Sequence, residues 1–274
     1  MIRLAALLML SWLLAGCGGD GGTLRLVVLD VGEGQAVLLQ RGTHGVLVDA
    51  GHPGMGARIL ARLRSYGVRT LDALYLTHLH PDHAGGYFRL REAFPSMVVR
   101  ESGHRPDWRA LPDTSRWIVE ALERDPRHQI VAAGHHWRWR GVDLAVLWPK
   151  APSGADLNAM SLVLQVGYGG AVVLIMGDAG TAAEAALLRA GRPPGPVAVL
   201  VVGHHGAADA SGERFLETVR PRMAVVSVNA GNRRGYPAPA VLRRLERWAG
   251  QVRRTDRDGD VCLALRRDGS GEPC

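Results

Sequence analysis

The sequence predicts a single α/β domain over residues 24–267, and three observations support that prediction. Short apolar runs that end in glycine or in a charged residue alternate with segments whose apolar residues recur at helical spacing. Apolar residues make up 47% of the 274 residues, as in a globular chain with a packed core. The longest break in the pattern, Pro149–Ala159, is too short for a linker between two domains.

The first half of the chain predicts a small sheet that leads into a buried strand. Glycine turns separate three short strands of a meander, which we expect at Leu24–Gly32, Gln35–Gln40 and Gly45–Gly51. A helix should follow at Gly56–Gly67, because its apolar residues recur every three or four positions and Gly67 ends the pattern. The buried strand Leu71–Thr77 comes next, and residues 115–123 have a helical pattern.

The second half predicts two hairpins and a further alternation of strands and helices. We expect the hairpins at Trp137–Pro149 and at Met160–Asp178, the second turned by Gly-Tyr-Gly-Gly. The later elements are a helix at Thr181–Gly191, a buried strand at Val197–Gly206, a helix at 211–219, a strand at 222–228, a helix at 238–248 and a final strand pair at 251–266.

Histidines and aspartates are concentrated at the ends of three expected strands. His78, His80, Asp82 and His83 fall within six positions, and the ends Gly177–Asp178 and Gly203–His205 carry the same side-chain chemistry. Imidazole nitrogens and carboxylate oxygens are ligands of zinc, manganese and iron. We therefore predict one or two divalent ions, zinc or manganese, and either His204 or His205 as a ligand. A purely structural cluster is disfavoured, because packed imidazoles need hydrogen-bond partners.

Six other histidines are interpreted as surface or loop residues without a part in the site. They are His44, His52, His104, His128, His135 and His136.

The N-terminus is typical of an export signal. Arg3 precedes the apolar run Leu4–Ala15, which is shorter than the roughly 20 residues of a membrane span. The run ends in Leu-Ala-Gly-Cys, which resembles a bacterial lipobox and implies that residues 1–16 are removed and that Cys17 is lipidated. An ordinary signal peptide and an uncleaved anchor are the alternatives. We expect an envelope protein that is lipid-anchored to the membrane by a tether at 17–23 and faces the periplasm or the cell exterior.

Two cysteines remain near the C-terminus. In an oxidising compartment Cys262 and Cys274 could pair and pin the tail at 268–274, or they could stay as free thiols. We expect no membrane span after the leader.

The formal charge of +7 favours an anionic partner, such as nucleic acid or a membrane surface. Solvated arginines are the alternative interpretation, and no basic run is long enough for a nucleic-acid-binding arm.

The histidine cluster resembles the His-x-His-x-Asp-His motif of the metallo-β-lactamase superfamily. His78, His80, Asp82 and His83 match the motif, while Val-Asp-Ala-Gly at Asp49, Met-Gly-Asp at Asp178 and Gly-His-His-Gly follow in family order. The resemblance implies an αββα sandwich with a two-metal site at its strand ends. It also implies that Asp178 bridges the ions.

Longer stretches, such as "LYLTHLHPDHAGG" and "VLVVGHHGAADAS", resemble the extracytoplasmic domain of ComEC-type competence proteins. That family takes up single-stranded DNA, and its domain is thought to process the strand left outside. The channel helices have no counterpart here, so we expect no DNA translocation by this chain.

The chain departs from that family at three places. Gly-Gln-Gly-Asp is replaced by Gly32-Glu33-Gly34-Gln35, and a histidine common before Pro237 is replaced by Tyr236. The third histidine of hydrolytic members has no match near Asn158, so Asn158 is a candidate metal or substrate contact. A single-metal site is therefore an alternative.

The resemblance implies metal-assisted hydrolysis of a phosphodiester in DNA or a related polyanion. Asp82 is a candidate proton acceptor, and His205 or Tyr236 a candidate proton donor or stabiliser of negative charge. Substrate phosphate could be bound by Asn232, Arg233 and Arg234. The alternatives are a hydrolase of small esters, lactones or thioesters, and a binding protein with a vestigial site.

Overall fold

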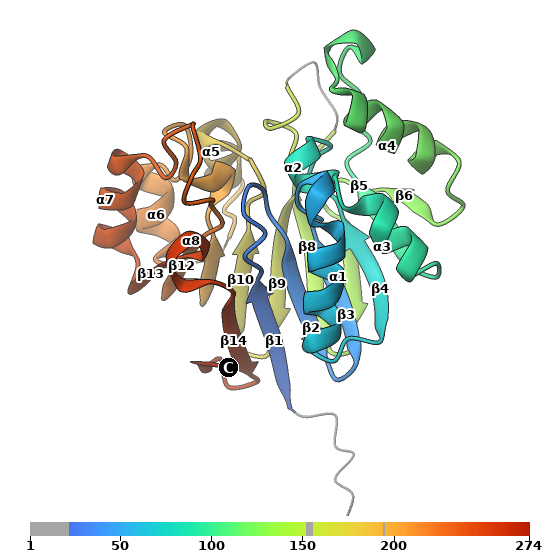
Figure 1. The fold of residues 1–274 in the computed structure, drawn as a ribbon. Helices are drawn as coiled ribbons and strands as arrows, with labels where there is room; N and C mark the ends of the chain where they lie inside the picture. Colours follow the sequence, from blue (N-terminus) through green and yellow to red (C-terminus); the bar gives the residue numbers. More distant parts are fainter. Residues whose placement is uncertain (1–21, 152–155, 194) are drawn as a thin grey trace, which may run out of the picture.

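Two β-sheets pack face to face, and helices cover both outer surfaces (Figure 1). The structure is a computed structural model that describes residues 22–151, 156–193 and 195–274. The first sheet contains, in spatial order, β15 (Gly271–Pro273), β14 (Val261–Arg266), β1 (Thr23–Val28), β2 (Val37–Arg41), β3 (His44–Val48), β4 (Thr70–Tyr75), β5 (Val98–Glu101) and β6 (His128–Ile130). The second contains β13 (Gln251–Arg254), β12 (Met223–Val226), β11 (Val199–Val201), β10 (Ala171–Ile175), β9 (Val163–Tyr168), β8 (Val142–Trp148) and β7 (His136–Trp139).

The helices divide between the two outer faces. The first sheet is covered by α1 (Gly56–Ser65), α3 (Tyr87–Ala93) and α4 (Asp113–Glu123), and the second by α5 (Thr181–Arg189), α6 (Glu213–Val219) and α7 (Pro239–Trp248) (Figure 1). Shorter turns are α2 (Pro81–Ala84), α8 (Thr255–Asp258), η1 (Pro53–Met55), η2 (Trp108–Ala110) and η3 (Gly203–Gly206). The expected αββα sandwich is confirmed.

Successive side chains of each strand point to opposite faces of the sheet, and this alternation explains why the hydrophobic core has three layers. In β1, Leu26 and Val28 face the other sheet and pack with residues such as Leu164, whereas the intervening Val27 packs under the helices with Ile59 of α1. A third cluster lies between the second sheet and its helices. Each sheet is therefore buried on both faces, which accounts for strands that are apolar almost throughout.

Parallel pairing brings the chemically active strand ends to one edge of the sandwich. β3, β4 and β5 pair in parallel in the first sheet, and β10, β11 and β12 do so in the second. Their carboxyl ends lie near α2 (Figure 1), and they lead into Asp49, His78, Asp178 and His204. This topology gathers residues that are up to about half the chain apart.

The prediction of a final strand pair at 251–266 is wrong. β13 pairs in parallel with β12 in the second sheet, while β14 pairs with β1 in the first, and α8 carries the chain between them. β15 lies within the expected tail and pairs with β14. A disulfide joins Cys262 of β14 to Cys274, which answers the question of pairing that the sequence left open.

No helix within the described ranges is long and apolar enough to cross a membrane. The expected leader and the expected lipidation site, Cys17, lie outside the described residues.

Candidate metal centre

The histidine motif forms a tight turn directly after β4. His80 is extended and precedes α2, and Pro81 occupies the first helical position, where a missing N–H costs nothing. The turn rests on the loop after β1: a Cβ atom at Gly34 would lie 1.8 Å from the carbonyl oxygen of Asp82. Only glycine permits this approach, because it has no Cβ atom. Glycine at position 34 therefore lets the loop after β1 pack directly against the motif.

The structure brings the motif together with Asp178 and His205 into two groups that can hold metal ions. One group is His78, His80 and Asp178, and the other is Asp82, His83 and His205; within each, the ligand atoms lie within 4.8 Å of one another. Ligand atoms that share one zinc ion at 2.0–2.2 Å lie about 3 to 4 Å apart, so small side-chain adjustments suffice.

Asp178 offers one carboxylate oxygen to each group. Its Oδ1 lies 3.0 Å from His83 Nε2 and 3.5 Å from His205 Nε2, whereas Oδ2 lies 3.8 Å from His78 Nε2. Only 2% of Asp178 is exposed, so this carboxylate has almost no access to water. The arrangement is the one a carboxylate shared between two ions requires.

Two observations test whether these residues suit a divalent cation. Asp178 Oδ1 is buried without an aligned hydrogen-bond donor, despite its closeness to His83. The Nε2 atoms of His83 and His205 lie 3.1 Å apart, although each of these rings donates from Nδ1 to another acceptor. Acceptors converging on one point without matching donors are what a cation satisfies, so the residues fit one.

Burial and neighbouring charges shift the pKa values of these groups in opposite directions. Burial and the charge of His83 lower the pKa of His78 well below its usual value. Burial disfavours charge on His83 too, but Asp178 and Asp49 outweigh it and raise the pKa of His83 well above the usual value. Burial opposes ionisation of Asp178, yet His83 and His205 hold its pKa well below the usual range. The cluster thus favours ionised carboxylates at neutral pH, the form that binds metal, whereas a metal ion would have to displace a proton from His83.

Asp82 was expected to accept a proton as well as to bind metal. Burial raises its pKa, but a hydrogen bond from His205 and the charge of His83 lower it more, so the net shift is downward. A carboxylate with a lowered pKa is a weaker base and a better cation ligand, so its environment favours the ligand role.

Hydrogen bonds to the far sides of the rings fix their orientation. His83 Nδ1 donates to Asp49 Oδ2 at 2.7 Å, and His205 Nδ1 donates to the Ser227 carbonyl at 2.9 Å. Ser161 Oγ lies 3.2 Å from His78 Nδ1 and also accepts from the backbone N–H of Asp178. Such contacts fix the tautomer and leave Nε2 free for a metal. Ser161 and Ser227 were not anticipated, because nothing in a serine's sequence position shows which ring it will face.

Of the two adjacent histidines, the structure places His205 in a ligand group. His204 turns the other way: its Nε2 accepts from Asn158 Nδ2 at 3.1 Å, and its Nδ1 donates to Asp209 at 3.0 Å. Both residues have positive φ, 49° and 53°, which separates their side chains. Asn158 therefore lies at the margin of the site, where it contacts both His204 and His80 of the first ligand group. The Nε2 atom of His204 lies 3.8 Å from Asp178 Oδ2.

A small, narrow cleft opens beside the second ligand group. Its lining includes Asp82, His205, Glu33, Arg234 and Tyr236. Arg234 lies 3.8 Å from Glu33 across the cleft, and both side chains are about half exposed. A guanidinium and a phenol thus stand next to the candidate metal centre.

The other two predicted substrate contacts, Asn232 and Arg233, have different surroundings. The side chain of Asn232 donates to the Asn229 and Tyr236 carbonyls and accepts from the Tyr236 N–H, so it holds the loop together. Arg233 is exposed on the same loop.

The remaining histidines lie outside the ligand groups, as expected. His104 lies in the loop between β5 and η2, but this loop residue is buried, with only 3% of it exposed. His128 pairs with buried Glu101 at 2.8 Å, and His44 with Asp72 at 2.9 Å. None of the three belongs to either ligand group.

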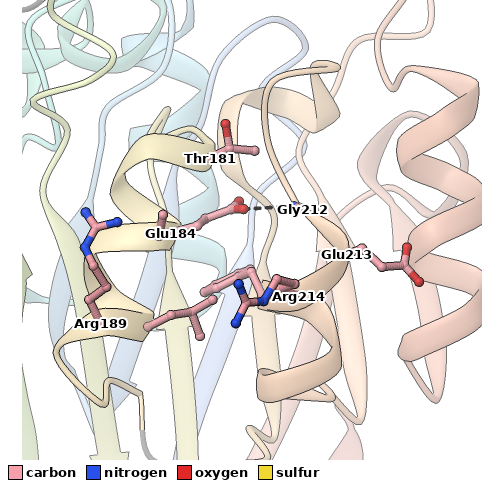
Figure 2. A pocket seen from close by; sticks show the side chains of 9 residues that line it. Thr181, Glu184, Arg189, Gly212, Glu213 and Arg214 are labelled. Carbon is pink, nitrogen blue, oxygen red and sulfur yellow. Dashed lines mark hydrogen bonds between the residues drawn. The ribbon is translucent and has the colours of Figure 1, made fainter.

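A larger groove between α5 and α6 shares no residue with the ligand groups (Figure 2). Arg189 and Arg214 flank it, and Glu184 extends across it toward Gly212.

Comparisons with known proteins agree with the fold and the motif. The family model described as the metallo-beta-lactamase superfamily matches residues 29–229. Competence protein ComA of Neisseria gonorrhoeae is 32% identical over 247 residues, which are 89% of this chain and 33% of that protein. ComE operon protein 3 of Bacillus subtilis (strain 168) is 30% identical over 255 residues, covering 85% and 32% respectively. The chain thus spans about a third of the length of these relatives.

Among solved structures, the metallo-beta-lactamase fold protein YhfI from Bacillus subtilis superimposes with a TM-score of 0.60. It is 14% identical, and the match covers 88% of this chain and 99% of that one. At that identity the likeness concerns the fold alone.

Proposed function

The chain belongs to the metallo-β-lactamase superfamily, and on that premise we propose that it is a metal-dependent phosphodiesterase acting on DNA or a related polyanion outside the cytoplasm. The observation that carries the proposal is the pair of ligand groups joined by Asp178, next to a cleft that presents Arg234. Similarity to competence proteins supports DNA as the polyanion and a link to DNA uptake.

Divalent ions bound by the two groups would supply activation of water near neutral pH and stabilisation of negative charge on phosphorus. Zinc or manganese suits the mixed imidazole and carboxylate donors. The side chains of this protein would then hold and orient the reactants. Asp178 spans both groups, and Arg234 and Arg233 bind the phosphate oxygens that do not react.

Hydrolysis adds water across one phosphodiester bond: an O–P bond forms from the water oxygen, the bond to the leaving oxygen breaks, and that oxygen takes up a proton. The proton lost by the water passes to solvent, from which the proton donor is restored. Tyr236 lines the cleft together with Asp82 and His205 of the second ligand group, and its ring centre is 5.7 Å from that of His204. We assign Tyr236 as the proton donor to the leaving oxygen, and His205 and Asp82 as ligands.

The disulfide between Cys262 and Cys274 supports a location in an oxidising compartment. Together with the leader, it supports a lipid anchor at Cys17 and a place in the bacterial cell envelope, facing the periplasm or the exterior.

The decisive experiment uses the purified full chain with Mn²⁺ or Zn²⁺ and end-labelled single-stranded and double-stranded DNA. We expect cleavage of DNA that disappears in His80→Ala, whereas the variant keeps salt-sensitive binding of the strand. Metal-loaded protein that cleaves no phosphodiester would refute the proposal.

A hydrolase of small esters, lactones or thioesters is the second candidate function, because the cleft beside the second ligand group is narrow and exposes mainly apolar atoms. Parallel assays with bis-p-nitrophenyl phosphate, a lactone and a thioester separate the two. Turnover confined to the lactone or thioester would establish the second function.

A further inference from the structure

We propose that Gln35 is a positioning residue, which fixes Asp49 and through it holds the ring of His83 in the orientation for metal binding. The proposal depends on the metal centre and not on the identity of the substrate. It gives a physical role to one of the places where the sequence departs from its ComEC-type resemblance.

Gln35 lies in the loop between β1 and β2 and forms hydrogen bonds with three other parts of the site. It is 1% exposed, and its Nε2 donates to Asp49 Oδ2 at 2.8 Å. Its backbone N–H donates to the Asp82 carbonyl at 3.2 Å, and its carbonyl accepts from Gly51 N–H at 2.9 Å. These bonds place the side-chain amide against Asp49.

Asp49 is fully buried and receives four hydrogen bonds. Oδ1 accepts from the backbone N–H of Thr77 at 2.7 Å, and Oδ2 accepts from the Thr77 hydroxyl, from Gln35 and from His83 Nδ1 at 2.7–2.9 Å. Its φ of 64° shows that the backbone too is held in an uncommon conformation. A carboxylate with this many fixed donors has one orientation, so it also fixes the ring that donates to it.

The orientation of His83 decides what its other nitrogen can do. Because Nδ1–H points at Asp49, the Nε2 atom of the ring points toward Asp178 Oδ1, 3.0 Å away, and toward His205. Carboxylates that orient ligand histidines in this way commonly contribute 10–100-fold to metal affinity. Gln35 acts one step further out, by fixing the carboxylate.

The amide is essential to this role because it donates. A carboxylate at position 35 would present an acceptor to the acceptor Oδ2 of Asp49, and the two would repel at 2.8 Å. Gln35→Glu has the same shape and removes only the donor, and Gln35→Met removes the polar group at similar length.

The test measures Zn²⁺ binding to the full chain by competition with a chromogenic chelator. We expect Gln35→Glu to weaken one of two binding events by about 10-fold or more, with the other retained. Gln35→Met should weaken the same event less, because it adds no repulsion. Thermal unfolding in excess chelator reports folding of each variant without metal.

The matched control is Gln40→Glu. Gln40 is also buried, on neighbouring β2, but its amide donates to the carbonyls of Gly42 and Tyr66, outside the site. It should lose stability while keeping wild-type Zn²⁺ affinity at both sites.

A double-mutant cycle shows whether Gln35 acts through Asp49. In an Asp49→Ala background, adding Gln35→Glu should have no further effect on Zn²⁺ affinity. Wild-type affinity in Gln35→Glu, equal losses in Gln40→Glu, or additive losses in the cycle would each overturn the proposal. Because substrate is absent from these measurements, their outcome is independent of whether DNA is cleaved.

Discussion

Asp178 contributes to both ligand groups, so its replacement should have the widest effect on metal content of any single residue. Both of its oxygens face histidine nitrogens within 4 Å, and its side chain is buried. We expect Asp178→Ala to retain fewer metal ions per chain than the one to two expected for wild-type protein, measured by elemental analysis after incubation with Mn²⁺ and Zn²⁺.

Asp143→Ala is the matched control, because Asp143 is exposed on β8 and pairs only with Arg138 among the described contacts. Its metal content should equal that of wild type. Equal metal content in Asp178→Ala and wild type would show that Asp178 is not a shared ligand.

Arg233 and Arg234 should determine how strongly salt weakens DNA binding. If each neutralises one phosphate, the double variant Arg233→Ala/Arg234→Ala should reduce the slope of log affinity against log salt by roughly 1–2 units for single-stranded DNA. A control with the same loss of charge is Arg64→Ala/Arg69→Ala. These exposed residues lie at and beyond the end of α1 remote from α2 (Figure 1). Identical slopes for the two variants would exclude a specific phosphate contact at the loop.

Replacing Glu33 should have the opposite effect on DNA binding from replacing the two arginines. Its carboxylate lies 3.8 Å from Arg234, where it would compete with a bound phosphate for the guanidinium. Glu33→Gln should therefore bind single-stranded DNA more tightly at fixed salt than wild type, as measured by fluorescence anisotropy. Weaker binding would mean that Glu33 orients Arg234 instead.

At the level of elements, Glu184 of α5 fixes the start of α6. Its carboxylate accepts from the backbone N–H groups of Ser211 and Gly212 at 2.6 and 2.8 Å. Figure 2 shows the bond to Gly212. Glu184→Ala should lower the free energy of unfolding by about 1–3 kcal/mol for each N–H left without a partner, measured by urea denaturation. Exposed Glu217→Ala on α6 should stay within about 0.5 kcal/mol of wild type.

The same residue predicts a dependence on pH. Burial raises the pKa of Glu184, more than its backbone hydrogen bonds lower it. The folded state therefore binds this proton more tightly than the unfolded state, so stability falls as pH rises from the unfolded pKa through the folded one. Glu184→Gln does not titrate. Stability of wild type relative to Glu184→Gln should thus decrease with rising pH in this window, and an increase would contradict the assignment.

The sequence was sufficient for most elements whose own residues determine their structure. Periodicity placed α1, α5 and α7 and both hairpins, since a helix or hairpin depends on local spacing. The pairing of β13 and β14 was wrong because membership of a sheet is a tertiary property: Gln251–Arg254 and Val261–Arg266 are close in sequence, yet they extend different sheets. The four-residue β5 and the short α2 and α3 were not predicted, because so few residues carry little periodicity.

The site, like the fold, could be predicted from the sequence only in part. Residue type and spacing were enough to pick out His78, His80, Asp82, His83 and Asp178, which the fold brings together. The choice between His204 and His205 depended on two positive φ angles. The contact of Gln35 depended on two loops of the first sheet, and that of Ser161 on loops meeting across the two sheets.

For the whole molecule, location is the property to test. Cys17→Ser should shift the protein from the membrane fraction to the soluble or unprocessed one and abolish fatty-acid labelling. Stable anchoring requires more than one acyl chain, because a single chain binds membranes with only about 10⁴ M⁻¹. Wild-type protein without label and with unchanged fractionation would contradict the prediction.

The disulfide at the end of the chain has a consequence for solubility. β15 pairs with Leu263–Leu265 of β14 and is tethered there by Cys274. Without it, β14 would present open N–H and C=O groups along an apolar strand, a template for strand addition by another copy. A three-residue strand that ends at Pro273 and Cys274 offers a poor template in its turn. Reduction should therefore favour intermolecular aggregation, and oxidative folding would protect the chain against it.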